Sequence, residues 1–386
     1  MMVPLAPLSP SGIHDSVDET VVVFAYAVGL LITAPSITHL TRRRSFQQKM
    51  LLATTLLGLA LCLIGCTTHF WVYVSGRVLQ GMSSAIVCVV GYAAVVTLNP
   101  AKSMAMLGFV LAAGSAGFIT GPALGGWLFD IRGYHYPFCC LCLILAVFAV
   151  VQWWSLADYL PARSASKTAS KTAPPFALAS PSKRHNTRRR TIYLSLCSIS
   201  VWPALLAAFT AMSWVTLEAF VPIKLYQEYA ETPQGVGTLF SLASLLSFLA
   251  STVVAFIALS TGKAAAPWFA TLGLMLMSAG FLLMAIYPSE HTVWLGVSIC
   301  SVAYTVLVYA ITASFGDLGN VHIKQLAHDA YERAYAGYAI SYATGYSIGS
   351  GLEYLCASFM SFKSVMICMS CLFAILLSLA FRKLLK

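Results

Sequence analysis

Charged residues are scarce in this sequence. Only 9% of its 386 residues are charged, against about 25% in ordinary soluble domains, while 59% are hydrophobic. No soluble fold could bury that much apolar surface. The composition therefore excludes a soluble protein and indicates an integral membrane protein.

Several signals of processing and of chemistry are also absent. The sequence has no Asn-x-Ser/Thr sequon, and its Pro-rich start lacks the basic and apolar regions of a cleaved signal peptide. It has no nucleophile elbow, no phosphate-binding loop and no His/Asp/Glu cluster with ligand spacing, so we expect no enzyme and no cofactor. Cys139, Cys140 and Cys142 are closely spaced, but no His or acidic residue accompanies them in the apolar run 136–157, so we expect no metal site.

Apolar runs long enough to cross a bilayer, about 17–25 residues each, recur along the whole chain. They predict eleven transmembrane helices, near 20–40, 50–66, 71–98, 104–129, 136–157, 192–222, 235–260, 264–287, 292–315, 334–359 and 361–381.

The net charge of +10 is concentrated in a few segments. With eleven spans, the basic clusters at 42–49, 158–190 and 382–386 fall on one side of the membrane, and the opposite side has only Arg132, Lys224 and Lys363. Cytoplasmic loops are enriched in Lys and Arg, so we expect a cytoplasmic C-terminus. We expect a multi-pass protein of the plasma membrane rather than of a vacuolar or vesicular membrane. The charge reports topology in a lipid bilayer and does not indicate a nucleic-acid partner.

Residues 158–190 form the only extended polar break, and their Ser, Lys, Pro and Arg content predicts a disordered linker. The linker separates an N-terminal part, 1–157, with five predicted spans from a C-terminal part, 191–386, with six. Many transporters contain two six-span halves around such a loop, so on that plan the first span is missing. The sequence lacks an upstream segment, is a short isoform that transports, or is a degenerate relative that does not; we expect the first.

The apolar run 104–129 carries small residues at every fourth position. They are Ala113, Gly117, Gly121 and Gly125, flanked by Gly114 and Gly126. Small residues let two membrane helices approach closely, so this face predicts a groove for a partner helix, and Pro122 predicts a bend there. On spacing alone, a moving and a static interface explain the pattern equally well.

The same residues carry a family resemblance. The run matches the antiporter signature in the fifth span of drug:proton antiporters of the major facilitator superfamily, through Gly117, Gly121, Pro122, Gly125 and Gly126. Upstream, GRVLQGMSSA at 76–85 resembles that superfamily's fourth-span motif through Arg77, Gln80 and Gly81. Segments 217–226, 234–244 and 334–352 are similar to the seventh, eighth and eleventh spans of vesicular amine transporters.

The resemblance implies an all-α major facilitator fold, in which two helical bundles rock around a central cavity. It further implies a monomeric secondary transporter that exports a small organic compound in exchange for protons, in the manner of fungal efflux pumps for secondary metabolites or toxins. The alternatives are a nutrient importer of the same superfamily and a truncated remnant that does not transport.

Two ionisable residues within predicted spans are candidates for proton coupling, because charge is costly in a bilayer. Arg77 takes the place where the family has an arginine tied to proton coupling, although a structural arginine bonded to carbonyls is the alternative. Glu218 lies four residues before Pro222, and desolvation there favours the neutral carboxyl, which suits proton uptake and release. Glu353 and Asp317 lie near span ends, where solvated roles are expected.

Tyrosines in the later spans are candidates for lining a substrate cavity: Tyr304, Tyr309, Tyr338, Tyr342 and Tyr346. The last three repeat every fourth residue and place hydroxyls along one helix face. Such a stripe suits a moderately polar, partly aromatic compound, and plain packing explains it nearly as well.

The sequence departs from the family in two loci besides the first span. In the loop PSITHLTRRRSFQQK, Thr38 replaces the usual Gly and Arg42 the usual Asp, so gating by that acidic residue is not expected. Thr305 and Ala339 stand where amine transporters carry intramembrane acids, so a simple amine is a poor substrate candidate.

Overall fold

The structure, a computed structural model, describes residues 16–40, 44–98, 102–155, 185–287, 289–323 and 330–384. Before the predicted linker the helices are α2 (Ser16–Leu40), α3 (Phe46–Cys66), α4 (Phe70–Ile86), α5 (Tyr92–Leu98), α6 (Ser103–Arg132) and α7 (His135–Ser155), with a π-helical turn, η2 (Val87–Gly91), joining α4 to α5. After it they are α9 (His185–Glu228), α10 (Pro233–Thr261), the short 3₁₀ turn η4 (Gly262–Ala265), α11 (Ala266–Ile286), α12 (Glu290–Ile323), α13 (Ala330–Phe359) and α14 (Phe362–Leu384).

The eleven predicted spans correspond to helices of this structure. Ten segments of the described residues are long and apolar enough to cross a membrane. The eleventh prediction, 334–359, coincides with α13, which is long enough at 30 residues but contains many Tyr, Ser and Gly residues. Those residues lower the mean hydropathy of α13. They are tolerated because α13 packs against other helices rather than lipid along much of its length.

Local sequence explains several helix boundaries. Ser45 accepts a hydrogen bond from the Gln48 amide and completes a capping box at the start of α3. Gly133 ends α6 and Gly262 ends α10 with positive φ angles of 77° and 61°, which glycine adopts without strain. Residues 158–184 of the predicted linker lie outside the described residues, whereas its last residues, 185–190, belong to α9, which begins at His185.

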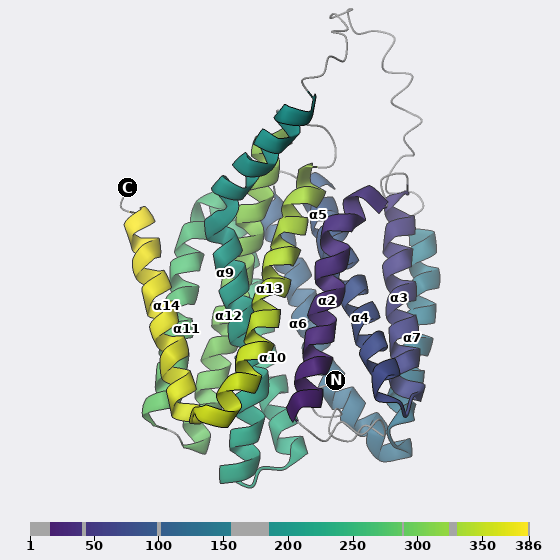
Figure 1. The fold of residues 1–386 in the computed structure, drawn as a ribbon, viewed down its shortest axis with the longest axis vertical. Helices are drawn as coiled ribbons and strands as arrows, with labels where there is room; N and C mark the ends of the chain where they lie inside the picture. The colour runs from purple at the N-terminus through teal and green to yellow at the C-terminus, as the bar shows by residue number, and fades with distance from the viewer. Residues whose placement is uncertain are drawn as a thin grey trace, which may run out of the picture.

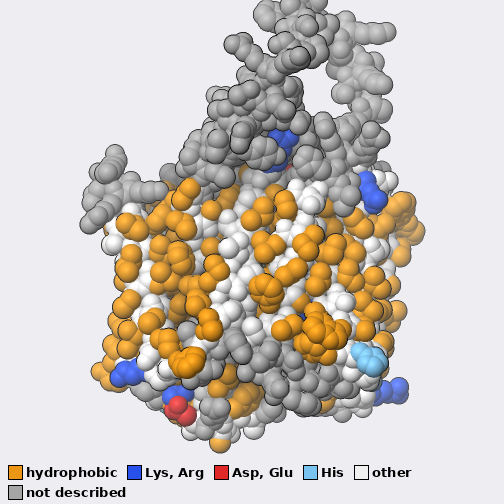
Figure 2. Space-filling view, in the orientation of Figure 1, with side chains coloured by type: hydrophobic (Ala, Val, Ile, Leu, Met, Phe, Trp, Pro, Cys, Tyr) orange, Lys and Arg blue, Asp and Glu red, His pale blue; other side chains and the backbone are white. Residues whose placement is uncertain are grey.

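The helices run roughly parallel to one another and form one bundle, with some helices in front of others (Figure 1). α2 begins at one end of the bundle, while α9 begins and α14 finishes at the opposite end (Figure 1). Figure 2 shows hydrophobic side chains over the middle of the visible face and Lys, Arg, Asp and Glu near its two ends. This distribution is the one that a bilayer requires of a spanning protein.

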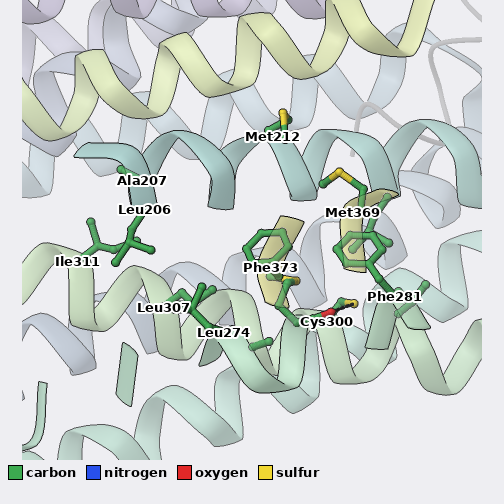
Figure 3. Close-up of a cluster of buried hydrophobic side chains, with 14 of the residues drawn as sticks. Leu206, Ala207, Met212, Leu274, Phe281, Cys300, Leu307, Ile311, Met369 and Phe373 are labelled. Atoms are coloured by element: carbon green, nitrogen blue, oxygen red, sulfur yellow. Dashed lines mark hydrogen bonds between the residues drawn. The ribbon is translucent and has the colours of Figure 1, made fainter. Parts of the chain in front are cut away.

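Close packing holds the bundle together, because lipid provides no hydrophobic driving force between helices. The largest core cluster joins α9, α11, α12 and α14, where Phe281 and Phe373 stack with centroids 6.1 Å apart (Figure 3). Across the chain halves, α2 packs against α13 and α6 packs against α10. These two contacts form the seam between the helices before and after the linker.

Glycines set the closest helix crossings. A Cβ on Gly81 of α4 would lie 2.0 Å from the Tyr26 carbonyl oxygen of α2, and one on Gly345 of α13 would lie 1.8 Å from the Ala208 carbonyl oxygen of α9. No side chain fits at either position. Glycine is therefore required at Gly81 for α2 to contact α4, and at Gly345 for α13 to contact α9.

Candidate functional site

A cavity of about 250 Å³ lies on the seam between the two sets of helices. Its walls come from α2, η2, α5 and α6 on one side and from α9, α10, α12 and α13 on the other. The lining side chains include the aromatic residues Tyr26, Tyr92, Phe118, Trp214, Tyr304, Tyr338 and Tyr342 and the hydroxyl residues Ser115, Ser244, Ser247, Ser301 and Thr305. No Asp, Glu, Lys or Arg is among the described residues that line it.

Three aromatic side chains from three helices form one wall of the cavity. The Trp214 and Tyr304 rings pack with centroids 4.9 Å apart, and the Tyr304 and Tyr342 hydroxyls share a hydrogen bond of 2.9 Å. Tyr342 in turn packs between Tyr338 and Tyr346, at centroid distances of 6.0 and 6.2 Å. The predicted tyrosine stripe of α13 therefore exists as a stacked ladder.

Hydroxyl groups of α10 and α12 line another part of the cavity. Ser247 Oγ and Ser301 Oγ lie 2.6 Å apart, and Ser301 Oγ donates to the Ala243 carbonyl at 3.0 Å. Thr305 Oγ1 donates to the Ser301 carbonyl at 3.1 Å. Thr305 and Ala339, which stand at the positions of the amine transporters' acids, both line the cavity.

The π-helical turn η2, which joins α4 to α5, borders the cavity. Such turns insert one extra residue into a helix and are frequent at functional sites. Cys88, within η2, and Tyr92, immediately after it, both line the cavity.

Arg77 is buried on α4 and fixed by two hydrogen bonds and an aromatic ring. Its Nε donates to the Val22 carbonyl at 3.3 Å, and its NH1 donates to the Gln80 side-chain oxygen at 2.7 Å. Its guanidinium carbon lies 5.5 Å from the centre of the Tyr26 ring. Both readings of Arg77 thus have support, since it bonds a helix carbonyl and also lies next to the cavity residue Tyr26.

The Glu218 carboxyl lies behind the cavity wall. The Trp214 indole N–H donates to its Oε1 at 2.8 Å, and the Tyr346 hydroxyl donates to its Oε2 at 3.4 Å. Trp214 itself lines the cavity, so one side chain touches both the carboxyl and the cavity. A charged Glu218 is therefore hydrogen-bonded rather than exposed to a bound molecule.

Two tyrosines link Arg77 to Glu218 across the seam. The Tyr26 ring, beneath the Arg77 guanidinium, packs against the Tyr346 ring with centroids 5.6 Å apart. Tyr346 then bonds to Glu218. The two predicted ionisable residues belong to one continuous group that joins α4, α2, α13 and α9.

Of the five predicted cavity tyrosines, Tyr304, Tyr338 and Tyr342 line the cavity. Tyr346 lies one layer behind them, against Glu218. Tyr309 does not line the cavity: it is fully buried and packs edge-on against Phe269, with centroids 5.5 Å apart. It lies five residues after Tyr304, a rotation of about 140° around the helix, so the two side chains point to different faces.

The fourth-span motif has a clear structural role. Arg77 and Gln80 bond to each other, and Gly81 lets the α2 backbone approach α4 directly. The motif therefore joins these two helices and holds Arg77 beside Tyr26.

The antiporter signature falls within α6, which runs as one helix from Ser103 to Arg132. At Gly114 and Gly117 a Cβ would meet no described atom within 4 Å, so the predicted partner helix is not found at these two positions. The close approach of α6 occurs instead at Gly108, where a Cβ would lie 2.7 Å from Ala255 Cβ of α10. Gly121 and Gly125 lie one and two turns beyond Gly117 on the same helix, and the structure does not describe the surroundings of Pro122 and Gly126.

One contact between the two sets of helices was not foreseen from the sequence. Lys49, near the start of α3, forms an ion pair of 2.5 Å with Glu332, near the start of α13. Only 10% and 18% of the two side chains are exposed. No local pattern identifies a pair whose members are 283 residues apart.

The described residues contain no group of three or more His, Cys, Asp or Glu side chains placed to hold a metal ion. Cys142 lies 3.5 Å from Cys62, thiol to thiol, on the neighbouring helix α3.

Residues 6–319 match the family model of the Major Facilitator Superfamily. The chain belongs to this superfamily. The all-α fold and the multi-pass membrane architecture expected from the sequence are those of the superfamily, whose members in the following comparisons are transporters rather than enzymes.

Among curated members of the superfamily, several multidrug-resistance proteins are similar to the chain. Multidrug resistance protein 2 of Bacillus subtilis is 34% identical over 132 residues, which is 33% of each chain. The class H tetracycline resistance protein of Pasteurella multocida is 31% identical over 144 residues, 35% of each chain. The chain thus aligns with about a third of the length of these relatives.

Solved structures of the superfamily share the fold over nearly the whole chain. The human organic anion transporter MFSD10 (TETRAN) superposes with a TM-score of 0.67 at 19% identity, covering 94% of this chain and 83% of its own. The fucose:proton symporter of Escherichia coli superposes with a TM-score of 0.63 at 12% identity, covering 94% and 90%.

Proposed function

We propose that the protein exports a small organic compound by alternating access, in exchange for protons. The observation that carries the proposal is the shared side chain Trp214, which lines the cavity and donates a hydrogen bond to the Glu218 carboxyl. The similarity to multidrug and tetracycline resistance proteins supports export over import.

The coupling step follows from the chemistry of the Glu218 carboxyl. As a carboxylate it accepts the hydrogen bonds of Trp214 and Tyr346, and hydrogen bonds to a charged acceptor are about twice as strong as neutral ones. A proton on Glu218 removes the charge, weakens both bonds and frees Trp214 to move in the cavity wall. Proton uptake and substrate release are then two effects of one event.

Arg77 supports the charged state of that carboxyl. Its guanidinium stays protonated at every physiological pH, and the Tyr26–Tyr346 pair keeps it close to Glu218 without a direct salt bridge. A proton arriving at Glu218 leaves the Arg77 charge unbalanced, which favours a rearrangement of the seam between α2 and α13.

The alternating motion is assigned to an N-terminal bundle of residues 1–157 and a C-terminal bundle of residues 191–386, which rock about the cavity. The basic residues favour a cytoplasmic C-terminus. The proposed location is the plasma membrane, and the proposed transporting unit is a single chain. Substrate, protons and lipid are then its partners.

Accumulation of tetracycline and other drugs in cells without their own pumps tests the proposal. The chain, its Glu218→Gln variant and an empty vector are compared with and without a proton uncoupler. Glu228→Gln is the matched control, because Glu228 lies at the end of the same helix, has a side chain that is 56% exposed and forms an ion pair with Lys224 of that helix.

The chain and the control are expected to lower accumulation several-fold, and Glu218→Gln or the uncoupler to abolish the effect. Export that survives both treatments contradicts coupling through Glu218. Raised accumulation indicates an importer, and accumulation equal to the empty vector for every compound, with the chain inserted, contradicts transport.

A further inference from the structure

The Ser and Thr side chains of the cavity wall present hydrogen-bond acceptors rather than donors, whereas Tyr26, Tyr92 and Tyr338 contribute hydroxyls elsewhere in the lining. All five of the described Ser and Thr side chains that line the cavity donate their protons within the protein. Ser115, Ser244 and Thr305 donate to carbonyls one turn earlier in their own helices, and Ser247 and Ser301 donate across the α10–α12 contact. The Trp214 N–H is likewise committed to Glu218.

On the Ser and Thr hydroxyls, only the oxygen lone pairs remain available to a bound molecule. A hydroxyl has one proton and two acceptor sites, so each of these side chains still accepts a hydrogen bond. The Tyr304–Tyr342 pair shares one proton between its oxygens and keeps one free O–H. A molecule that packs against these Ser and Thr side chains can bond to their oxygens only with donors of its own, and a buried polar group left without a partner is costly.

The charge of that molecule is constrained as well. No carboxylate is among the described residues that line the cavity, and Glu218 lies behind Trp214 with its two oxygens already bonded. Aromatic faces attract cations, but this attraction is smaller than the cost of removing an unpaired charge from water. An anion is disfavoured even more strongly, since Arg77 is bonded to Val22 and Gln80 and does not line the cavity.

From these observations we infer that the cavity binds an uncharged aromatic compound that donates hydrogen bonds, such as a phenol. Its ring packs against Trp214 and Tyr304, and its O–H or N–H groups meet the oxygens of Ser301 and Thr305. At about 250 Å³, the cavity lies just below the size of ordinary drug pockets, so the compound is compact. This inference rests on the proposed transport function and specifies its substrate class.

Equilibrium binding to the full chain in lipid nanodiscs, without an ion gradient, tests the inference. The probes share a naphthalene ring: 2-naphthol donates a hydrogen bond, 2-methoxynaphthalene does not, 2-naphthoate is an anion and (2-naphthyl)trimethylammonium is a cation. Empty nanodiscs measure partition into lipid. We expect saturable binding of 2-naphthol, at least about tenfold tighter than that of the other three.

Thr305→Val tests the wall directly, since it removes an acceptor oxygen with little change of shape. It is expected to weaken 2-naphthol about tenfold and to leave 2-methoxynaphthalene unchanged. Thr312→Val is the matched control, because Thr312 lies on the same helix, is fully buried and does not line the cavity. A folded Thr305→Asp variant is expected to gain affinity for the cation.

Equal or tighter binding of the cation, the anion or the methoxy compound overturns the inference, and so does the absence of saturable 2-naphthol binding. Because no gradient is present, this result is separate from the export test. Binding of the expected order in a chain that does not export contradicts the transport proposal alone, and export with a reversed order contradicts the substrate class alone.

Discussion

The Glu218 carboxyl depends on two side chains from two helices. Trp214 donates from the same helix at 2.8 Å and Tyr346 from α13 at 3.4 Å. Trp214→Phe keeps an aromatic ring and removes the shorter bond, and a bond to a charged group contributes about 1.5–3 kcal/mol. We expect this variant to lower the initial rate of proton-driven efflux from proteoliposomes about tenfold or more, and Tyr346→Phe to lower it less because its bond is longer.

Trp294→Phe is the control for this experiment. The Trp294 indole N–H is buried and has no hydrogen-bond partner among the described atoms, so its loss is expected to leave the efflux rate unchanged. A Trp214→Phe variant that transports at the wild-type rate contradicts the link between the cavity and Glu218.

At the scale of elements, the crossing of α2 and α4 depends on Gly81. A Cβ there would lie 2.0 Å from the Tyr26 carbonyl oxygen, a backbone atom that cannot move without its helix. Gly81→Ala is expected to destabilise the protein by about 2 kcal/mol or more, within or above the usual cost of overpacking. Thermal unfolding in detergent measures this as a lowered melting temperature.

Gly58→Ala provides the comparison, because a Cβ on Gly58 of α3 would meet no described atom within 4 Å. We expect it to be neutral or slightly stabilising, since alanine favours the helix by about 1 kcal/mol over glycine. Equal melting temperatures for the two variants would show that α2 and α4 are not held at this crossing.

The helices themselves were predictable, but their contacts were less so. Runs of apolar residues marked the ten described segments that are long and apolar enough to cross a membrane, because the bilayer imposes both length and composition on each helix. The π turn η2, whose Cys88 lines the cavity, is not revealed by a regular helical period. Tyr309 was predicted to line the cavity because it is a tyrosine. That prediction did not take into account that its side chain is rotated by about 140° from that of Tyr304 around the helix.

In the whole molecule, the Lys49–Glu332 pair fastens one end of the seam. It joins α3 to α13, at the end of the bundle where α9 begins (Figure 1). If the two sets of helices separate at this end during transport, the pair has to break. Removing one partner of a fully buried ion pair costs about 3–5 kcal/mol, and less where both side chains retain some exposure, as here.

Lys49→Met or Glu332→Gln is therefore expected to favour the conformation open at this end. Cys88 reports the change, since it lines the cavity and can be alkylated there by a water-soluble maleimide. We expect each variant to raise the alkylation rate of Cys88 about tenfold, which corresponds to about 1.4 kcal/mol. The exchanged pair, Lys49→Glu with Glu332→Lys, is expected to restore the wild-type rate.

Glu228→Gln again serves as the control, because it breaks an ion pair within α9 and not one across the seam. Mass spectrometry of the peptide that contains Cys88 separates its labelling from that of the other cysteines. If the single variants and the exchanged pair all label at the wild-type rate, the ion pair does not hold this end closed. If the single variants raise the alkylation rate but the exchanged pair does not restore it, the effect belongs to one side chain and not to the ion pair. Packing of α2 against α13 would then hold this end of the seam closed.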